Sequence, residues 1–109
     1  MTTKDNKKSA ARKFMEEITG GPLTLSSLLY SIRLGEEMTQ EEFAQMLGIS
    51  KSHVCDIEKG RKHVSPLRAK EFARILKHSE QQFIRLALQD IVDQLSQKHI
   101  WQVELKKAA

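Results

Sequence analysis

The chain has 109 residues and a mass of 12.5 kDa, with 39% apolar residues, 29% charged residues and a formal net charge of +4. This composition is ordinary for a globular protein, and the length gives room for one small domain with extensions rather than two full cores. No apolar stretch is long enough to cross a bilayer, so we expect no membrane-spanning segment.

The N-terminal sequence and the cysteine content favour a cytoplasmic protein. The opening residues, MTTKDNKKSAARK, lack the apolar core of a secretory signal, so we expect none. Cys55 is the only cysteine and cannot form an internal disulfide, which fits a reducing compartment.

The positive charge is concentrated between Lys51 and Lys77. This window holds eight basic and three acidic residues, a net of +5, which leaves ten of the 18 basic and eleven of the 14 acidic residues elsewhere. A positive field focused on one region is typical of a protein that binds a polyanion. Solvated helix faces would give the same pattern, so charge alone does not decide.

Residues 1–22 form a basic leader that ends in a linker, Gly20-Gly21-Pro22. Within it, Ser9 can cap a short helix that stops at Gly20. One side of that helix would carry an apolar patch of Phe14, Met15 and Ile18.

Residues 23–98 predict an all-α domain of helices joined by short turns. The first helix ends near Gly35, and its apolar stripe has the i, i+3, i+4, i+7 spacing. That stripe consists of Leu25, Leu28, Leu29 and Ile32. A second helix begins at a capping box in which Thr39 and Glu42 bond each other's main chain, and it ends at a tight turn around Gly48. It is expected to bury Phe43, Ala44 and Leu47.

The next stretch, SKSHVCDIEKG at residues 50–60, predicts a third helix between the N-cap Ser50 and Gly60. Val54 and Ile57 point one way along it. The opposite side forms a coherent polar surface about 140° wide. Its members are Lys51, Ser52, Cys55, Asp56 and Lys59.

Two further helices follow. Ser65-Pro66 is an N-cap followed by proline at the first helical position. A second capping box, Ser79 with Gln82, opens a long helix. Its apolar stripe is about 180° wide, more than one packing partner needs. The stripe comprises Phe83, Ile84, Ala87, Leu88, Ile91, Val92 and Leu95.

Residues 99–109 change to a period of two. Trp101, Val103 and Leu105 alternate with polar residues, the pattern of a half-buried β-strand. No other segment offers a partner strand, and two strands alone are only marginally stable. We therefore predict that this C-terminal strand pairs with its copy across a homodimer, with these three side chains in the contact.

The stretch TQEEFAQMLGISKSHVCDIEKGR, residues 39–61, resembles the helix-turn-helix of the lambda-repressor-like, Cro/CI-type (XRE) family of bacterial and phage regulators. The matching features are Gln40 at the start of the first helix, the spacing of Ala44 and Gly48, the buried Val54 and Ile57, and the closing residues 58–61, EKGR. The resemblance extends over residues 24–77 and implies a five-helix DNA-binding domain. It covers neither the leader nor the tail.

The resemblance implies that the helix of residues 50–60 enters the major groove of double-stranded DNA. Lys51 and Ser52 would then reach base edges, as would Cys55 and Asp56 one turn later. A lysine can pair with guanine and an aspartate can accept from cytosine. Because a carboxylate repels phosphate, we interpret Asp56 as a base reader or discriminator. The alternative is that it only solvates the helix or pairs with a nearby lysine or arginine.

Phosphate contacts would fall to other residues. By resemblance, Gln40 contacts the DNA backbone from a helix N-terminus, and the residues after the recognition helix touch the same strand, which positions the protein without reading sequence. Those residues are Lys59, Arg61 and Lys62. His63 is a further candidate, whereas Arg68 fits a solvated helix surface equally well.

The resemblance also implies a structural ion pair between Arg33, late in the first helix, and Glu58, late in the third. Glu58 lies near the edge of the buried face, where an unpaired charge would be costly. The alternative is two independent surface charges.

We expect no enzyme, no metal site and no cofactor. The four histidines show no metal-binding spacing. Cys55 has acidic neighbours that disfavour a thiolate, and the phosphate-loop motif is missing at Gly20-Gly21.

We therefore predict a sequence-specific transcriptional repressor that binds a palindromic operator as a dimer. The alternative is a HigA-type antitoxin that neutralises a small toxin protein and uses DNA binding only to regulate its own operon. The toxin would then bind the patch in the leader or the tail. A phage repressor is a third possibility, which the lack of a larger C-terminal domain weakens.

Overall fold

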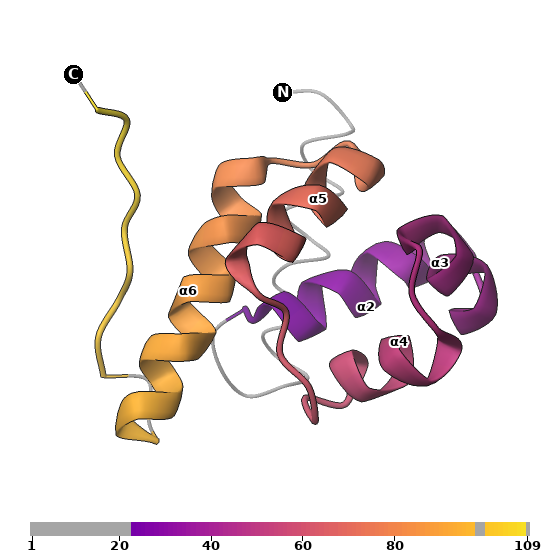
Figure 1. Cartoon of the computed structure of the whole chain (residues 1–109), viewed down its shortest axis with the longest axis horizontal. Coiled ribbons are helices and arrows are strands. Elements are labelled where there is room, and N and C mark those ends of the chain that lie inside the picture. Colours follow the sequence, from indigo (N-terminus) through magenta and orange to yellow (C-terminus); the bar gives the residue numbers. More distant parts are fainter. Residues whose placement is uncertain (1–22, 98–99, 109) are drawn as a thin grey trace.

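The computed structural model describes residues 23–97 and 100–108. Figure 1 shows that this part of the chain folds into helices joined by short loops. They are α2 (Leu25–Gly35), α3 (Gln40–Leu47), α4 (Lys51–Glu58), α5 (Pro66–Leu76) and α6 (Glu80–Ser96). The predicted all-α domain of five helices is therefore confirmed. The leader of residues 1–22, with its predicted helix and apolar patch, lies outside the described residues.

Each helix begins at a hydroxyl side chain that accepts a hydrogen bond from the main chain three residues later. The predicted capping box at α3 is complete, and the bond from the Thr39 N–H holds the pKa of Glu42 below its usual value. At α6 only the serine half of the predicted box forms. The box that opens α2, between Thr24 and Ser27, was not predicted, because serine is an uncommon third residue in this motif.

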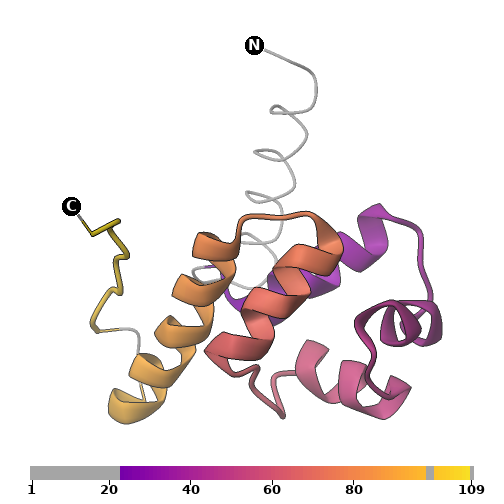
Figure 2. The same ribbon diagram turned by 45° about the horizontal axis from the view of Figure 1, so that its top comes forward.

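One hydrophobic core joins all five helices. Figures 1 and 2 show α3 and α4 on one side of the molecule and α6 on the other, with α2 and α5 between them. Helix α5 packs along α6, α3 packs on α4, and α2 contacts both α4 and α6. The largest fully buried side chains are Phe43, Phe72, Phe83, Leu25, Leu29 and Leu86. This core anchors α4 through its apolar side.

The face that α6 buries differs from the predicted stripe. Leu86, which the stripe omitted, is fully buried, and so is the polar Gln89 at 5% exposure. Leu95 is 76% exposed and Ile91 is also exposed, although both belong to the stripe. The first half of α6 therefore closes the core, whereas its C-terminal end leaves apolar surface uncovered.

The predicted C-terminal strand is not observed. Residues 100–108 run along α6 without strand structure (Figure 1), with Trp101 exposed and Val103 and Leu105 half-buried. A strand needs a second main chain to pair with, and the described residues provide none. Side chains of α6 bond the segment instead. The single chain therefore shows no strand, and both the C-terminal strand and its pairing between two copies stay predictions.

Within the described residues, no helix combines the length and apolarity that crossing a membrane requires.

Candidate nucleic-acid interface

A glycine turn sets α4 against α3. Gly48 ends α3 in the left-handed conformation, φ 74°, where a residue with a Cβ would be strained. The N–H of Ile49 then donates to the carbonyl of Ala44 at 3.0 Å, which closes the end of α3. The chain turns within Gly48, Ile49 and Ser50, and Ser50 caps α4. The two helices thus form a compact helix-turn-helix, as predicted.

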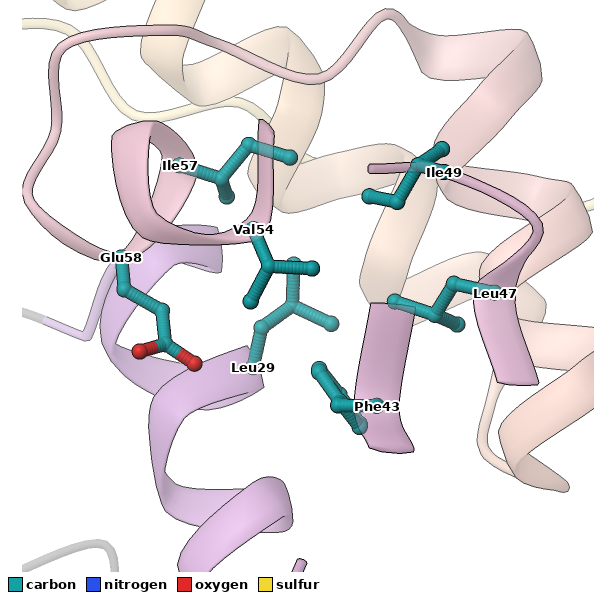
Figure 3. Close-up of a pocket in the computed structure, with 7 residues that line it drawn as sticks. All are labelled: Leu29, Phe43, Leu47, Ile49, Val54, Ile57 and Glu58. Atoms are coloured by element: carbon teal, nitrogen blue, oxygen red, sulfur yellow. The ribbon is translucent and has the colours of Figure 1, made fainter. Parts of the chain in front are cut away.

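The inward side of α4 packs against side chains of α2, α3 and the turn between α3 and α4. Figure 3 shows the side chains that meet there. They are Leu29, Phe43, Leu47, Ile49, Val54, Ile57 and Glu58. Val54 and Ile57 are buried, and the packing leaves no room for a ligand. Because this side anchors α4, only the opposite side of the helix is available for recognition.

The outward side of α4 carries the predicted base-reading residues. Lys51 and Ser52 are exposed in the first turn, as is Lys59 just after the helix. Cys55 and Asp56 share this side but are half-buried. The most accessible part of the surface is therefore its N-terminal turn.

Glu58 joins three parts of the helix-turn-helix through one carboxylate. Arg33 of α2 donates from Nε to Oε2 at 2.7 Å and from Nη2 to Oε1 at 3.1 Å. Gln40 at the start of α3 donates from Nε2 to Oε1 at 3.0 Å. The side chains of Arg33 and Glu58 are only 12% and 5% exposed, and the bond to Glu58 raises the pKa of the arginine. A two-pronged pair of this kind is among the strong charge-assisted contacts.

The same arginine fixes the loop that leads into α3. Its Nη1 donates to the carbonyl of Met38 at 2.9 Å. The structure thus brings Arg33 and Glu58 together and adds Gln40, a connection that sequence reasoning missed. Gln40 was singled out only as a phosphate contact, and its link to Glu58 spans 18 positions of sequence. No local pattern reveals a bond over that separation.

Asp56 faces cations of its own chain. Its Oδ1 accepts from Nε of Arg61 at 3.1 Å, and its Oδ2 lies 3.7 Å from Nζ of Lys62. Its main-chain carbonyl also accepts from the N–H groups of both residues. The structure thus shows the ion pairing that was the alternative to base reading by Asp56. It also ties two predicted phosphate contacts to the end of α4.

The remaining cations differ in their partners. Lys59, Arg61 and Lys62 are all exposed around the end of α4. His63 Nδ1 lies 3.8 Å from Oδ2 of Asp90 on α6, which ties this loop to the last helix. Burial raises the pKa of Asp90, and the nearby His63 partly offsets this rise. Arg68 is exposed on α5, and no ion pair reaches it within the described residues.

The electrostatics of the interface are mixed. Exposed cations lie at both ends of α4, but Glu41 and Glu42 occupy the first turn of α3 beside Gln40. These carboxylates favour the helix dipole and repel a phosphate. Gln40 is half-buried and held by Glu58, so an approaching phosphate would meet an oriented amide rather than a mobile one.

Comparison with protein families agrees with this geometry. A family model described as helix-turn-helix matches residues 29–83, half of the chain. The match begins in α2 and ends in the first turn of α6. Comparisons with curated proteins and with solved structures yield no match.

Proposed function

The chain belongs to the Cro/CI-type helix-turn-helix family of DNA-binding transcriptional regulators, and from this premise we propose that it is a repressor that binds a palindromic operator as a homodimer. Each copy would insert α4 into the major groove of one half-site. Because a regulator of this kind acts on DNA, we place it in the cytoplasm, at the nucleoid. The proposed role involves no catalysis and no cofactor.

The observation that carries the proposal is the division of α4 into two sides. Val54 and Ile57 anchor the helix in the core, and the other side exposes Lys51 and Ser52 at its N-terminal turn. Short or medium polar side chains on a protruding helix suit the donor and acceptor pattern of major-groove base edges. We assign base reading to Lys51 and Ser52 first, and to Cys55 and Asp56 in the second turn.

Asp56 would read bases only when its own partners release it. In the free chain its carboxylate is engaged by Arg61 and Lys62. A phosphodiester beside the end of α4 also presents two charged oxygens, so it competes with the carboxylate for the same two cations. We propose that the cations turn toward the DNA backbone on binding, which frees Asp56 to accept from a cytosine.

Repression follows from occupancy. A dimer with two-fold symmetry presents two α4 helices to an inverted repeat, with half-site centres about 34 Å apart or a multiple of that distance. Such a complex covers roughly two turns of duplex and would exclude polymerase from a promoter that contains it.

The direct test is to select bound sites from random duplex DNA with the full-length chain. The proposal expects an enriched inverted repeat, with half-sites separated by whole helical turns. Enrichment of a single unrepeated site would contradict the palindromic operator. No enrichment over the input, with binding that does not depend on sequence, would contradict specific recognition altogether.

The antitoxin remains the alternative proposal, and one observation favours it. Apolar side chains are exposed at the end of α6 and at the start of the tail, and an exposed apolar surface of this kind suits a protein partner. They are Ile91, Leu95, Ile100 and Trp101. Co-expression with a small basic protein encoded by a neighbouring gene tests this function. Copurification of the two proteins would support the antitoxin function. Separation of the two proteins during purification would contradict it and leave the repressor as the only proposed function.

A further inference from the structure

The tail is fastened to α6 along one edge of its main chain. The side-chain amide of Gln89 donates to the carbonyl of Trp101 and accepts from the N–H of Val103 at 2.7 Å. Two turns earlier in α6, Gln81 donates to the carbonyl of Leu105 at 2.9 Å. Gln89 is buried while it makes these bonds. The helix therefore holds the tail by its main chain, at odd-numbered residues only.

The other edge of the tail is open. In an extended chain the N–H and C=O groups of successive residues point to opposite edges. Residues 101, 103 and 105 face α6, so the groups of Gln102, Glu104 and Lys106 face away from it. No hydrogen bond of the described residues uses a main-chain N–H or C=O of those three residues. They form a short row of free donors and acceptors, which is the feature that a partner strand recognises.

Apolar side chains are exposed both on the tail and at the end of α6. Trp101 is 57% exposed, and Ile91, Leu95 and Ile100 are exposed too. Figures 1 and 2 show that α6 and the tail lie on the side of the molecule away from α3 and α4. A partner bound here would gain apolar contacts as well as main-chain hydrogen bonds, and it would leave α4 open to DNA.

We propose that the outer edge of residues 100–106 is the seam of the homodimer, where two copies pair as antiparallel strands about a two-fold axis at Val103. This inference rests on the proposed dimeric regulator and adds the surface, the edge and the register. Each tail then has α6 glutamines on one edge and its copy on the other. The seam is a two-stranded ribbon carried by two helices.

The side chains favour this register over its neighbours. An axis at Val103 places Val103 opposite its own copy and Trp101 opposite Leu105 of the second copy, so the apolar face is continuous. An axis at Glu104 would set two carboxylates directly opposite each other, which is destabilising. An axis at Leu105 would pair Glu104 with Lys106 but would set Val103 against Lys107. Only the axis at Val103 sets Trp101, Val103 and Leu105 opposite one another.

A matched pair of substitutions tests the edge. Glu104→Pro removes an N–H that the seam needs and leaves the Gln89 and Gln81 bonds intact, because those use residues 101, 103 and 105. Glu104→Ala removes the same side chain and keeps the N–H. By light scattering we expect a dimer for the parent and for Glu104→Ala, and a monomer for Glu104→Pro at the same concentration. A dimeric Glu104→Pro, or a monomeric parent, would overturn the seam.

Cysteine cross-linking tests the register. Val103 faces its copy at a non-hydrogen-bonded position, where Cα atoms are about 4.5 Å apart, within the range that a disulfide spans. In a Cys55→Ser background, Val103→Cys should form a covalent dimer under mild oxidation and Leu105→Cys should not. Cross-linking at Leu105 with none at Val103 would overturn the register.

These outcomes separate the seam from the function. If the parent binds its selected operator and Glu104→Pro stays dimeric, the proposed seam is wrong and the proposed repressor function stands. If Val103→Cys forms the covalent dimer and the parent enriches no DNA sequence, the proposed repressor function is wrong and the proposed seam stands. A single-half-site duplex provides a further check, because it needs one α4 only. The monomeric Glu104→Pro should bind it as the parent does, within about twofold.

Discussion

Two polar side chains that are shielded from solvent have contrasting roles at the two ends of this molecule. Glu58 in α4 accepts hydrogen bonds on both oxygens, all from its own chain, and closes the helix-turn-helix around itself. Gln89 in α6 holds the main chain of the tail by one edge and leaves the other edge open. The first region is complete within one chain, whereas we propose that the second pairs with another copy of the chain.

The difference separates two requirements that a DNA-binding regulator meets. Recognition needs a rigid helix, because the groove accepts side chains only in a fixed orientation. Assembly needs a surface that keeps its structure in the single chain but still has hydrogen-bonding groups free for a second chain. A carboxylate with every partner in place suits the first purpose, and an extended segment with half of its main-chain groups free suits the second. The predictions below test one region or the other, or the contact between them.

The largest effect on stability is expected in the closed region. Arg33→Ala leaves Glu58 charged and nearly buried beside the core, and losing one partner of such a pair costs roughly 3–5 kcal/mol. Arg68→Ala is the matched control, because Arg68 is exposed on α5 and has no ion pair among the described residues. Its loss should lower the free energy of unfolding by no more than about 0.5 kcal/mol. Urea denaturation followed by circular dichroism measures both. Equal unfolding free energies for the two variants would show that the network does not close this region.

Removal of residues 99–109 should weaken operator binding rather than the fold of α2 to α5. We expect a monomer whose affinity for the full palindrome falls by roughly a hundredfold or more, because the second half-site is no longer bound within the same complex. Light scattering and gel-shift titration measure the two properties together. A truncated chain that remains dimeric with the parent's affinity would show that the tail is not needed for assembly, and a partner-binding role for it would become the better explanation.

Much of the closed region could be predicted because its signals are local. The caps at Thr39, Ser50 and Ser65 depend on residues within a few positions of each other, and all three form. The apolar and polar sides of α4 follow from helical periodicity alone. The pairing of Arg33 with Glu58 spans 25 positions, and only the family resemblance suggested it.

The features that escaped prediction each depend on contacts that a local sequence pattern does not reveal. Gln40 bonds Glu58, and Gln89 is buried against the tail, yet a glutamine in a helical sequence normally indicates exposed surface. Asp56 could be assigned either to bases or to nearby cations, and only the structure shows Arg61 beside it. The alternating pattern of the tail predicted a strand. A strand also depends on a second chain, and the sequence of one chain cannot supply it.

A smaller effect is expected at the cations that Asp56 holds. Arg61→Ala and Lys62→Ala should each weaken binding to all sequences alike and reduce the salt dependence by about one unit of slope, if the side chain neutralises a phosphate. Affinities measured at several salt concentrations give the slope. An unchanged slope would mean that the pairing with Asp56 persists on DNA.

The smallest effect concerns the contact between the two regions. Burial raises the pKa of Asp90 above its usual value, with Asp93 adding to the rise and His63 opposing it. A raised pKa favours folding at low pH, and this contribution is lost as the pH rises through the folded-state pKa. Asp90→Asn should therefore unfold at a slightly higher temperature than the parent at pH 7, with the difference shrinking toward pH 4. A less stable Asp90→Asn at pH 7 would show that the His63 contact outweighs burial.

The central claim, that the exposed side of α4 reads DNA sequence, is tested most directly by comparing two lysines at its ends. Binding of the parent, Lys51→Ala and Lys59→Ala is measured on the selected operator and on every single-base variant of one half-site. Lys51→Ala should lose discrimination at one base pair, by about 1–3 kcal/mol. Lys59→Ala should weaken binding to all sites evenly. If Lys51→Ala keeps the parent's preference at every position, α4 does not read the operator through this face.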